Sequence, residues 1–252
     1  MMLFLRSLIF NVLGYGTLAV GCIVTSVIGI FSKKATIKLW TYMFLPFLVF
    51  CLKYVAGITI EVRGKQYIQN GPALYASKHE SALETYIMST IVKDMAFVLK
   101  KELTYIPIFG WAQYFYGMVA VDRSAGGAAM KGMLRNVKQR IAEGRSVIIF
   151  PEGTRMKAGT CGEYKPGLVF LAQNLDVPVV PVALNTGLVW AKKSFLRRRG
   201  KVIIEFLEPL PKGLDKKEFM SLLQQKIESK CQVLNQETVK NYPNTAKNLV
   251  KG

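Results

Sequence analysis

Residues 73–92 read Ala-Leu-Tyr-Ala-Ser-Lys-His-Glu-Ser-Ala-Leu-Glu-Thr-Tyr-Ile-Met-Ser-Thr-Ile-Val. The first five are apolar or small and predict a short buried strand, whereas residues 81–92 have the apolar spacing of a helix. A strand that leads through a loop into a helix is a basic unit of an α/β domain. His79, the single histidine of the chain, falls in the loop between the two.

The same alternation continues on both sides of this stretch. We predict seven strands, at Ile58–Val62, Ala73–Ser77, Ala96–Leu99, Met118–Val121, Ser146–Phe150, Val179–Leu184 and Val202–Phe206. The apolar spacing predicts helices at Ser81–Val92, Ile108–Tyr116, Gly127–Glu143 and Lys216–Leu234. The pattern therefore indicates the α/β class, with a mixed, largely parallel sheet flanked by helices.

The composition favours a lipid partner. Lys and Arg number 34 against 16 Asp and Glu, so the chain carries a net charge of +18. A surplus of this size indicates polyanionic partners, and nucleic acid and anionic lipid both qualify. Because 51% of the residues are hydrophobic and no RNA-recognition signature is present, we expect an anionic membrane surface and no nucleic acid.

The N-terminal segment is apolar enough to enter a membrane. Residues 7–31 include no charged side chain, and these 25 positions would form a helix of roughly 37 Å. A second apolar run, Leu39–Leu52, has only 14 residues and contains Pro46. We therefore expect the second run to re-enter the bilayer or lie in its interface.

Lysines between the two apolar runs predict the orientation. Lys33, Lys34 and Lys38 outnumber Arg6 before the first run, so the positive-inside rule leaves the rest of the chain on the cytoplasmic side. The tail after Asn235 is polar, lacks a core face and is expected to be disordered. Charge and apolarity together divide the chain into a membrane anchor (1–55), an α/β catalytic domain (56–235) and a polar tail (236–252).

His79 is the first candidate for chemistry. An imidazole titrates near pH ~6.5 and can accept a proton at neutral pH. Glu84, five positions later, could orient the ring if His79 precedes the helix and Glu84 lies in its first turn. A second interpretation stays open, because residues 81–84 (SALE) also fit a capping box in which Glu84 only binds the helix backbone.

A second candidate site follows the predicted strand at residues 146–150. Phe150-Pro151-Glu152-Gly153-Thr154-Arg155 is a glycine turn in which backbone N–H groups, a hydroxyl and a guanidinium can converge on an anion. We expect Gly153, Thr154 and Arg155 to bind a phosphate and Glu152 to orient the turn. Lys100 and Lys101, after another predicted strand, could add positive charge to the same phosphate.

Four segments carry a family resemblance. Residues 79–84 (HESALE), 100–103 (KKEL), 150–155 (FPEGTR) and 177–182 (VPVVPV) resemble, in order and spacing, the four blocks of the 1-acyl-glycerol-3-phosphate acyltransferase family. The resemblance covers about residues 55–210 and implies the glycerolipid acyltransferase fold. One departure matters, since the family usually has Asp where this chain has Glu84. From its two prolines, we expect residues 177–184 to form a buried edge strand.

The resemblance also implies a reaction. An acyl group would pass from acyl-CoA or an acyl-carrier protein to the sn-2 hydroxyl of a lysophosphatidic acid in the membrane, giving phosphatidic acid. In this scheme His79 is the general base, Glu84 its partner, and no cofactor or metal is required beyond the acyl donor. Alternatives left open are another acceptor, such as glycerol 3-phosphate or a lyso-aminolipid, and a non-catalytic basic membrane-binding protein. The densest basic cluster, Lys192–Lys201, would suit an anionic membrane surface or remain solvated.

Overall fold

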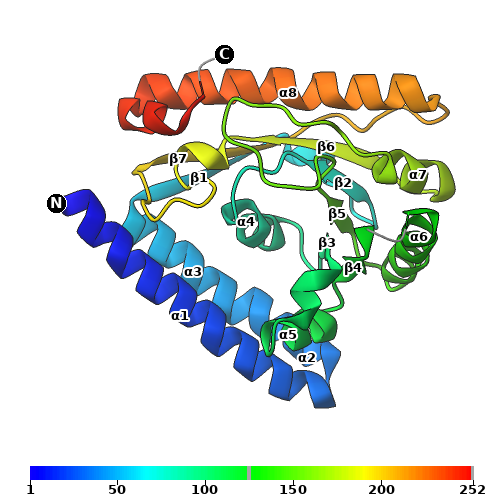
Figure 1. Ribbon diagram of the computed structural model, residues 1–252, viewed down its shortest axis with the longest axis horizontal. Helices are drawn as coiled ribbons and strands as arrows, with labels where there is room; N and C mark the ends of the chain where they lie inside the picture. The colour runs from blue at the N-terminus through cyan, green and yellow to red at the C-terminus, as the bar shows by residue number, and fades with distance from the viewer. Residues whose placement is uncertain (124–125, 251–252) are drawn as a thin grey trace.

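The computed structural model describes residues 1–123 and 126–250. Its centre is a seven-stranded sheet in the order β1-β7-β6-β2-β5-β3-β4, with helices on both faces (Figure 1). The strands are β1 (Ile58–Arg63), β2 (Leu74–Ser77), β3 (Ala96–Lys100), β4 (Val119–Val121), β5 (Val147–Ile149), β6 (Val179–Leu184) and β7 (Gly200–Phe206). All seven predicted strands are present, and the predicted fold class is confirmed.

The pairing of the strands brings distant loops together. β6 and β7 are antiparallel, while β2 pairs in parallel with both β5 and β6, and β3 pairs in parallel with β5 and β4. The carboxyl ends of β2, β3, β4, β5 and β6 therefore lie at one edge of the sheet, where open α/β sheets bind their ligands. The loops carrying His79 and Arg155 begin at this edge, and Lys100 is the last residue of β3 there.

Two apolar layers sandwich the sheet. On one face Tyr75 and its neighbours pack against α4 (Leu83–Ile91) and the N-terminal helices. On the other face Leu74 and Ala76 pack against α6 (Gly126–Ala142), α7 (Gly167–Asn174) and α8 (Lys216–Asn241). A fifth helix, α5 (Phe109–Tyr116), lies beside the N-terminal helices (Figure 1). The short helix α7 was not predicted.

The expectation of an edge strand at residues 177–184 was wrong. β6 lies inside the sheet between β7 and β2, and all six of its residues are buried. Pro181 is tolerated there because pairing with β7 begins only at Val182, opposite the last residue of that strand. The Pro181 carbonyl accepts a bond from Leu207 N–H, just beyond β7, so the missing N–H of the proline faces a place where the ladder has ended.

The N-terminal residues form a helical hairpin. α1 (Met2–Phe31) is followed by a continuous helical stretch, Lys33–Ala56, which Gly57 ends with a positive φ of 66°. Within this stretch are α2 (Lys33–Leu39), η1 (Trp40–Phe44), α3 (Leu45–Cys51) and η2 (Leu52–Ala56), of which η1 and η2 are π-helical.

The second apolar run is thus helical and longer than expected. Pro46 does not break it, because the wider π-helical turn before it is closed by a bond from Leu45 N–H to the Trp40 carbonyl and leaves room for the proline ring. The hairpin closes tightly where Trp40 lies against Gly21, and a Cβ at position 21 would overlap the indole ring.

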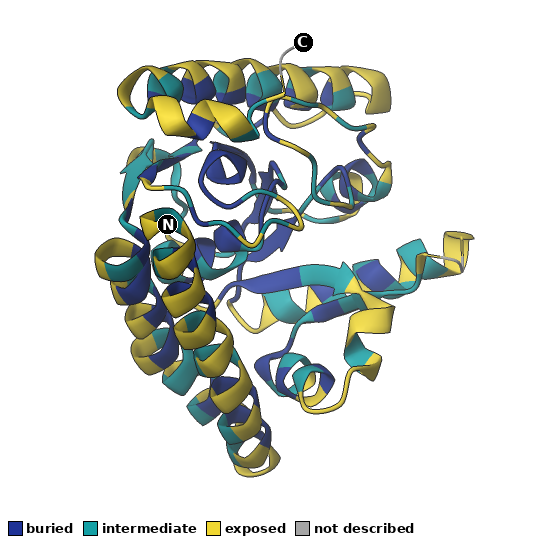
Figure 2. Ribbon diagram, turned by 60° about the vertical axis from the view of Figure 1, so that its left-hand side comes forward, coloured by how far each residue is buried: buried dark blue, intermediate teal, exposed yellow. Residues whose placement is uncertain are grey.

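Both helices of the hairpin are long and apolar enough to cross a membrane. Only 28% of the apolar window of α1 and 33% of that of the second helix is buried, so they are unlike the core helices of a soluble protein. Figure 2 shows exposed residues along the outer side of the hairpin. The hairpin therefore fits the expected membrane segment.

The hairpin lies along the α/β domain rather than projecting from it (Figure 1). Near the start of α1, Ser7 Oγ accepts a bond from Arg197 N–H and Asn11 donates to the Phe195 carbonyl. Near its end, Ser26 Oγ donates to the Ile108 carbonyl. One side of α1 is therefore occupied by the domain from its first turns to its last.

The basic cluster at residues 192–201 is only partly solvated. Arg197 is fully buried, and its guanidinium lies 3.9 Å from the centroid of the Trp190 ring. Burial lowers the pKa of Arg197 to about 10, and at neutral pH the group stays charged. Lys192, Lys193 and Arg199 are exposed, so these three can face an anionic surface.

The polar tail is ordered through residue 250, contrary to expectation. α8 continues to Asn241, and Thr238 and Thr245 are buried. The Asn185 amide donates to Thr238 Oγ1 at 2.7 Å, and Val250 N–H donates to the Ala158 carbonyl. Hydrogen bonds to the domain hold this segment in place. The prediction of disorder considered only the lack of an apolar face, and such hydrogen bonds leave no apolar pattern in the sequence. Residues 251–252 lie outside the described residues.

Candidate active site

His79 and Glu84 form a hydrogen-bonded pair at the carboxyl end of β2. His79 Nδ1 lies 2.7 Å from Glu84 Oε1, and the imidazole stacks on Phe150 at 3.9 Å between ring centroids. The carboxylate is fully buried, whereas the imidazole is partly exposed and lines a cavity. A carboxylate at Nδ1 favours the tautomer with its proton there, which leaves Nε2 free to accept a proton.

The same carboxylate also binds the start of α4. Glu84 Oε1 accepts bonds from the N–H groups of Glu80 and Ser81, at 2.9 and 2.8 Å. The helix begins at Leu83, and Ser81 Oγ accepts from Leu83 N–H instead of Glu84 N–H. The capping box is therefore half formed, and Glu84 both caps the helix and orients His79.

Thr186 completes the environment of Glu84 and was missed from the sequence. It follows β6 in a short 3₁₀ turn, is fully buried, and donates from Oγ1 to Glu84 Oε2 at 2.7 Å. The next N–H, that of Gly187, donates to Glu80 Oε2 at 2.9 Å. Burial raises the pKa of Glu80 to about 8, so that this carboxyl group is mostly protonated at neutral pH and adds little negative charge beside the pair.

We expect replacement of Thr186 by valine to lower the turnover number about tenfold, because a hydrogen bond to a charged carboxylate is lost without a change in shape. The Michaelis constants should change little, since Thr186 does not line the cavity. Thr186→Ser should restore most of the turnover. Steady-state kinetics of both variants test this, and full activity of Thr186→Val would show that Glu84 is held without the hydroxyl.

The cavity beside His79 has a volume of about 940 Å³ and is lined largely by apolar side chains. It extends from His79 to Leu18, Cys22 and Trp40 of the hairpin. Lys100, Gly153, Thr154 and Arg155 also line it, so the structure brings most of the predicted phosphate-binding residues together with His79.

Lys101 does not share this cavity. Its ammonium lies 3.1 Å from Asp122 Oδ2, and the hydrogen bond to that carboxylate raises the pKa of Lys101. It lines a separate groove between α5 and α6. The expectation that both lysines face one site was therefore wrong, since Lys100 lines the cavity with His79 and Lys101 does not.

Arg123 is a cation that sequence reasoning missed. It follows β4, lines the cavity, and donates from its guanidinium to the Gly153 carbonyl. On the other side of the turn, Lys192 donates to the Arg155 carbonyl at 2.7 Å. Since Arg123 follows a predicted strand just as Lys100 does, its position at the end of that strand was the available signal.

Glu152, expected to orient the turn, lies in a buried ion network. Its Oε1 accepts bonds from Lys78 Nζ at 2.7 Å and from Gly162 N–H at 3.0 Å. Lys78 also binds Glu228 of α8 at 2.9 Å. Burial lowers the pKa of Lys78, but the two carboxylates more than offset this and leave it raised. The network joins the end of β2, just before His79, to the turn after β5.

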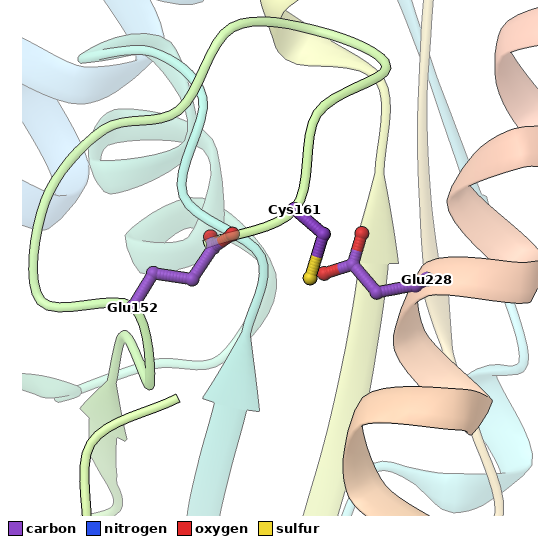
Figure 3. A group of neighbouring side chains, drawn as sticks. All are labelled: Glu152, Cys161 and Glu228. Carbon is purple, nitrogen blue, oxygen red and sulfur yellow. The ribbon is translucent and has the colours of Figure 1, made fainter. Parts of the chain in front are cut away.

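Glu152, Cys161 and Glu228 turn their side chains toward one another (Figure 3), and their ligand-type atoms lie within 4.8 Å. Carboxylates and a thiol could hold a metal ion. However, the Lys78 ammonium already lies within 3 Å of both carboxylates and supplies the positive charge there. We therefore interpret this cluster as part of the ion network.

Comparison with known proteins agrees with this geometry. A family model described as Acyltransferase matches residues 59–185, about half of the chain and all four sequence blocks. A 1-acyl-sn-glycerol-3-phosphate acyltransferase of Pseudomonas aeruginosa is 38% identical over 156 residues, which cover 62% of this chain and 61% of that protein. The beta form of Homo sapiens is 30% identical over 163 residues, covering 63% and 58%. The chain thus matches less than two thirds of either relative.

A solved structure shares the fold. The crystal structure of the 1-acyl-sn-glycerophosphate (LPA) acyltransferase PlsC from Thermotoga maritima superimposes with a TM-score of 0.72, covering 91% of this chain and 97% of that one. Its sequence identity is 21%, so this likeness supports the architecture rather than the chemistry. From the match over residues 59–185, the chain belongs to the acyltransferase family.

Proposed function

We propose that the protein transfers an acyl group from a thioester to the sn-2 hydroxyl of a 1-acyl-glycerol-3-phosphate. The observation that carries this proposal is that the His79–Glu84 pair and the phosphate turn open into one apolar cavity walled partly by the hairpin. The relatives from Pseudomonas aeruginosa and Homo sapiens bear the name of this activity. A phosphorylated lipid matches a site that is cationic at one place and apolar along its length.

The reaction needs one base and no covalent enzyme intermediate. His79 Nε2 takes the proton of the acceptor hydroxyl as its oxygen attacks the thioester carbonyl, and Glu84 stabilises the imidazolium. The tetrahedral intermediate collapses, the C–S bond breaks, and the imidazolium returns its proton to the thiolate. The products are the ester and the free thiol of CoA or of a carrier protein, and the donor is a co-substrate rather than a cofactor.

The acceptor phosphate is assigned to the turn after β5. Arg155 offers a planar fork of donors that matches phosphate oxygens, with Lys100 as a second cation and the backbone of Gly153 and Thr154 beside them. Holding the phosphate at this place positions the hydroxyl near His79, which is itself a large part of such rate enhancements.

The hairpin orients the enzyme on the membrane. Because one side of α1 is covered by the domain along its length, we propose that the hairpin lies in the interface of one leaflet, with the domain on the cytoplasmic side. The cavity wall formed by Leu18, Cys22 and Trp40 would then admit acyl chains directly from the lipid.

Replacement of Arg155 by alanine tests the phosphate site. We expect the Michaelis constant for the lysolipid acceptor to rise about 10- to 100-fold, the range of a charged hydrogen-bonding pair, while that of the acyl donor changes less than about threefold. Arg155→Lys should recover little, because the fork is lost.

The measurement is release of free thiol from acyl-CoA, with and without a panel of acceptors. Thiol release that depends on 1-acyl-glycerol-3-phosphate supports the proposal. If glycerol 3-phosphate or a lyso-aminolipid stimulates thiol release more strongly, that compound is the acceptor instead. An equal rise in the Michaelis constants for donor and acceptor in Arg155→Ala would contradict the assigned phosphate site.

A further inference from the structure

The segment before and within α5 carries exposed apolar side chains. Between 38% and 66% of each is exposed, and three are aromatic with a polar edge: Tyr105 (66% exposed), Trp111 (58%) and Tyr114 (66%). We call this surface the α5 patch, and it consists of Leu103, Tyr105, Ile106, Ile108, Trp111 and Tyr114. Several exposed large apolar side chains within one short segment indicate a candidate binding face.

The α5 patch is continuous with the hairpin. A Cβ at Gly29 of α1 would overlap the ring of Phe115, and the Lys33 ammonium lies 5.2 Å from the centroid of the Tyr114 ring. Phe31, at the end of α1, is 84% exposed. The α5 patch therefore adjoins the end of α1 and the start of the second helix, so a surface that covers this end of the hairpin also reaches the patch.

One residue of the patch has a strained backbone. Ile108 has a φ of 66°, which is unfavourable for a β-branched residue. Its carbonyl accepts the bond from Ser26 Oγ of α1 at 3.2 Å. The hairpin thus contacts the loop before α5 at the residue whose backbone is strained.

The opposite side of the same segment forms a wall of the catalytic cavity. Phe109, Ala112, Gln113 and Tyr116 of α5 line that cavity, whereas Trp111 and Tyr114 do not. The cavity and the exposed side chains of Trp111 and Tyr114 therefore lie on different sides of α5, and Leu103 of the patch itself lines the cavity, so a lipid surface in contact with the patch would lie beside the cavity.

We propose that the α5 patch is a second membrane-docking surface, which inserts into the interface of a phospholipid bilayer together with the hairpin and delivers the lipid acceptor to the cavity. Trp and Tyr side chains favour the level of the lipid headgroups, where their rings meet acyl chains and their polar edges meet water. The neighbouring cations Lys33 and Lys34 suit anionic headgroups. The docking does not depend on the proposed function, but the delivery of acceptor rests on it.

Tryptophan fluorescence tests the docking itself. The full-length protein is bound to phosphatidylcholine–phosphatidylglycerol vesicles with and without brominated acyl chains, beside Trp111→Phe. We expect bromine to quench the parent more strongly than Trp111→Phe, because the exposed Trp111 would lie within the lipid. Equal quenched fractions in the two proteins would overturn the proposal, as would detergent-free dimerisation that depends on Trp111 and covers the patch with a second copy.

Kinetics test the delivery of acceptor. We expect Trp111→Ser/Tyr114→Ser to lower the rate at least about tenfold with a long-chain lysolipid in vesicles, and less than about twofold with a short-chain acceptor dissolved in water. The matched control is Val233→Ser, which removes an exposed apolar side chain from α8 and should change neither rate.

The outcomes separate the two proposals. If the Trp111→Ser/Tyr114→Ser protein acylates the lysolipid in vesicles at the rate of the parent, or loses the same fraction of its rate with both acceptors, the patch does not deliver the acceptor. If the parent acylates neither acceptor, the proposed function fails, while the quenching experiment still decides whether the patch docks on lipid.

Discussion

The His79→Ala protein is expected to turn over about 10²- to 10⁴-fold more slowly than the parent, the range that general acid–base catalysis contributes. His79 is the single histidine of the chain, so no second imidazole can take its place. Its side chain is partly exposed, and the unfolding midpoint should change little. Turnover and thermal unfolding measured together test this, and residual activity within tenfold of the parent would remove His79 from the role of base.

Glu84→Gln separates the two tasks of this carboxylate. Its amide oxygen can still accept the Ser81 N–H, and its NH₂ group can donate to the Thr186 hydroxyl, which then turns to accept. We therefore expect most of the stability to remain. Turnover should fall toward that of His79→Ala, because the neutral amide no longer stabilises the imidazolium that forms when His79 takes the proton.

Two variants serve as controls. Ser81→Ala should lower the free energy of unfolding by about 1 kcal/mol, because the hydrogen bond from Leu83 N–H to the Ser81 hydroxyl is lost. Its turnover number should stay close to that of the parent. Glu84→Asp keeps the charge and matches the usual family residue, and it should retain part of the activity. If Glu84→Gln turned over like the parent, Glu84 would be a helix cap alone.

Replacing Lys78 by methionine is expected to destabilise the protein by about 3–5 kcal/mol, because the Glu152 carboxylate would remain buried without its partner. Chemical denaturation measures this loss. Lys157→Met is the matched control, since Lys157 is exposed and should change stability by less than about 0.5 kcal/mol.

A second variant shows whether charge is the cause. Lys78→Met/Glu152→Gln removes both charges of the buried pair and should regain part of the stability lost in Lys78→Met. A double variant as unstable as Lys78→Met would mean that packing around the lysine stem, rather than the unpaired carboxylate, decides the effect.

The positions of the strands and of the catalytic loop follow from local pattern. Short β-branched runs and helical spacing located all seven strands and four of the five helices of the α/β domain, since these features depend on neighbours within a few residues. Residues 79–84 and 150–155 could be identified as candidate sites because each follows such a strand. The two interpretations of Glu84 could not be separated from sequence, and the structure satisfies both.

Other features depend on contacts between residues far apart in the chain. Thr186 meets Glu84 across 102 positions, and Lys78 meets Glu228 across 150; neither pair has a local signature. Lys100 and Lys101 are adjacent in sequence, yet only Lys100 lines the cavity with His79. Lys100 is the last residue of β3 and Lys101 is the first of the 3₁₀ turn that follows, and the direction in which the chain leaves the strand could not be read from the sequence.

The sequence by itself determined the class of fold, the apolar N-terminus, and the residue types able to do acyl-transfer chemistry, because periodicity, charge and turn residues act over short range. Only the tertiary structure decided the strand order that joins the loops after β2, β5 and β6, the central place of β6, the helical hairpin through Pro46, and the ordered tail. These features arise where packing and buried hydrogen bonds between distant segments outweigh local preference.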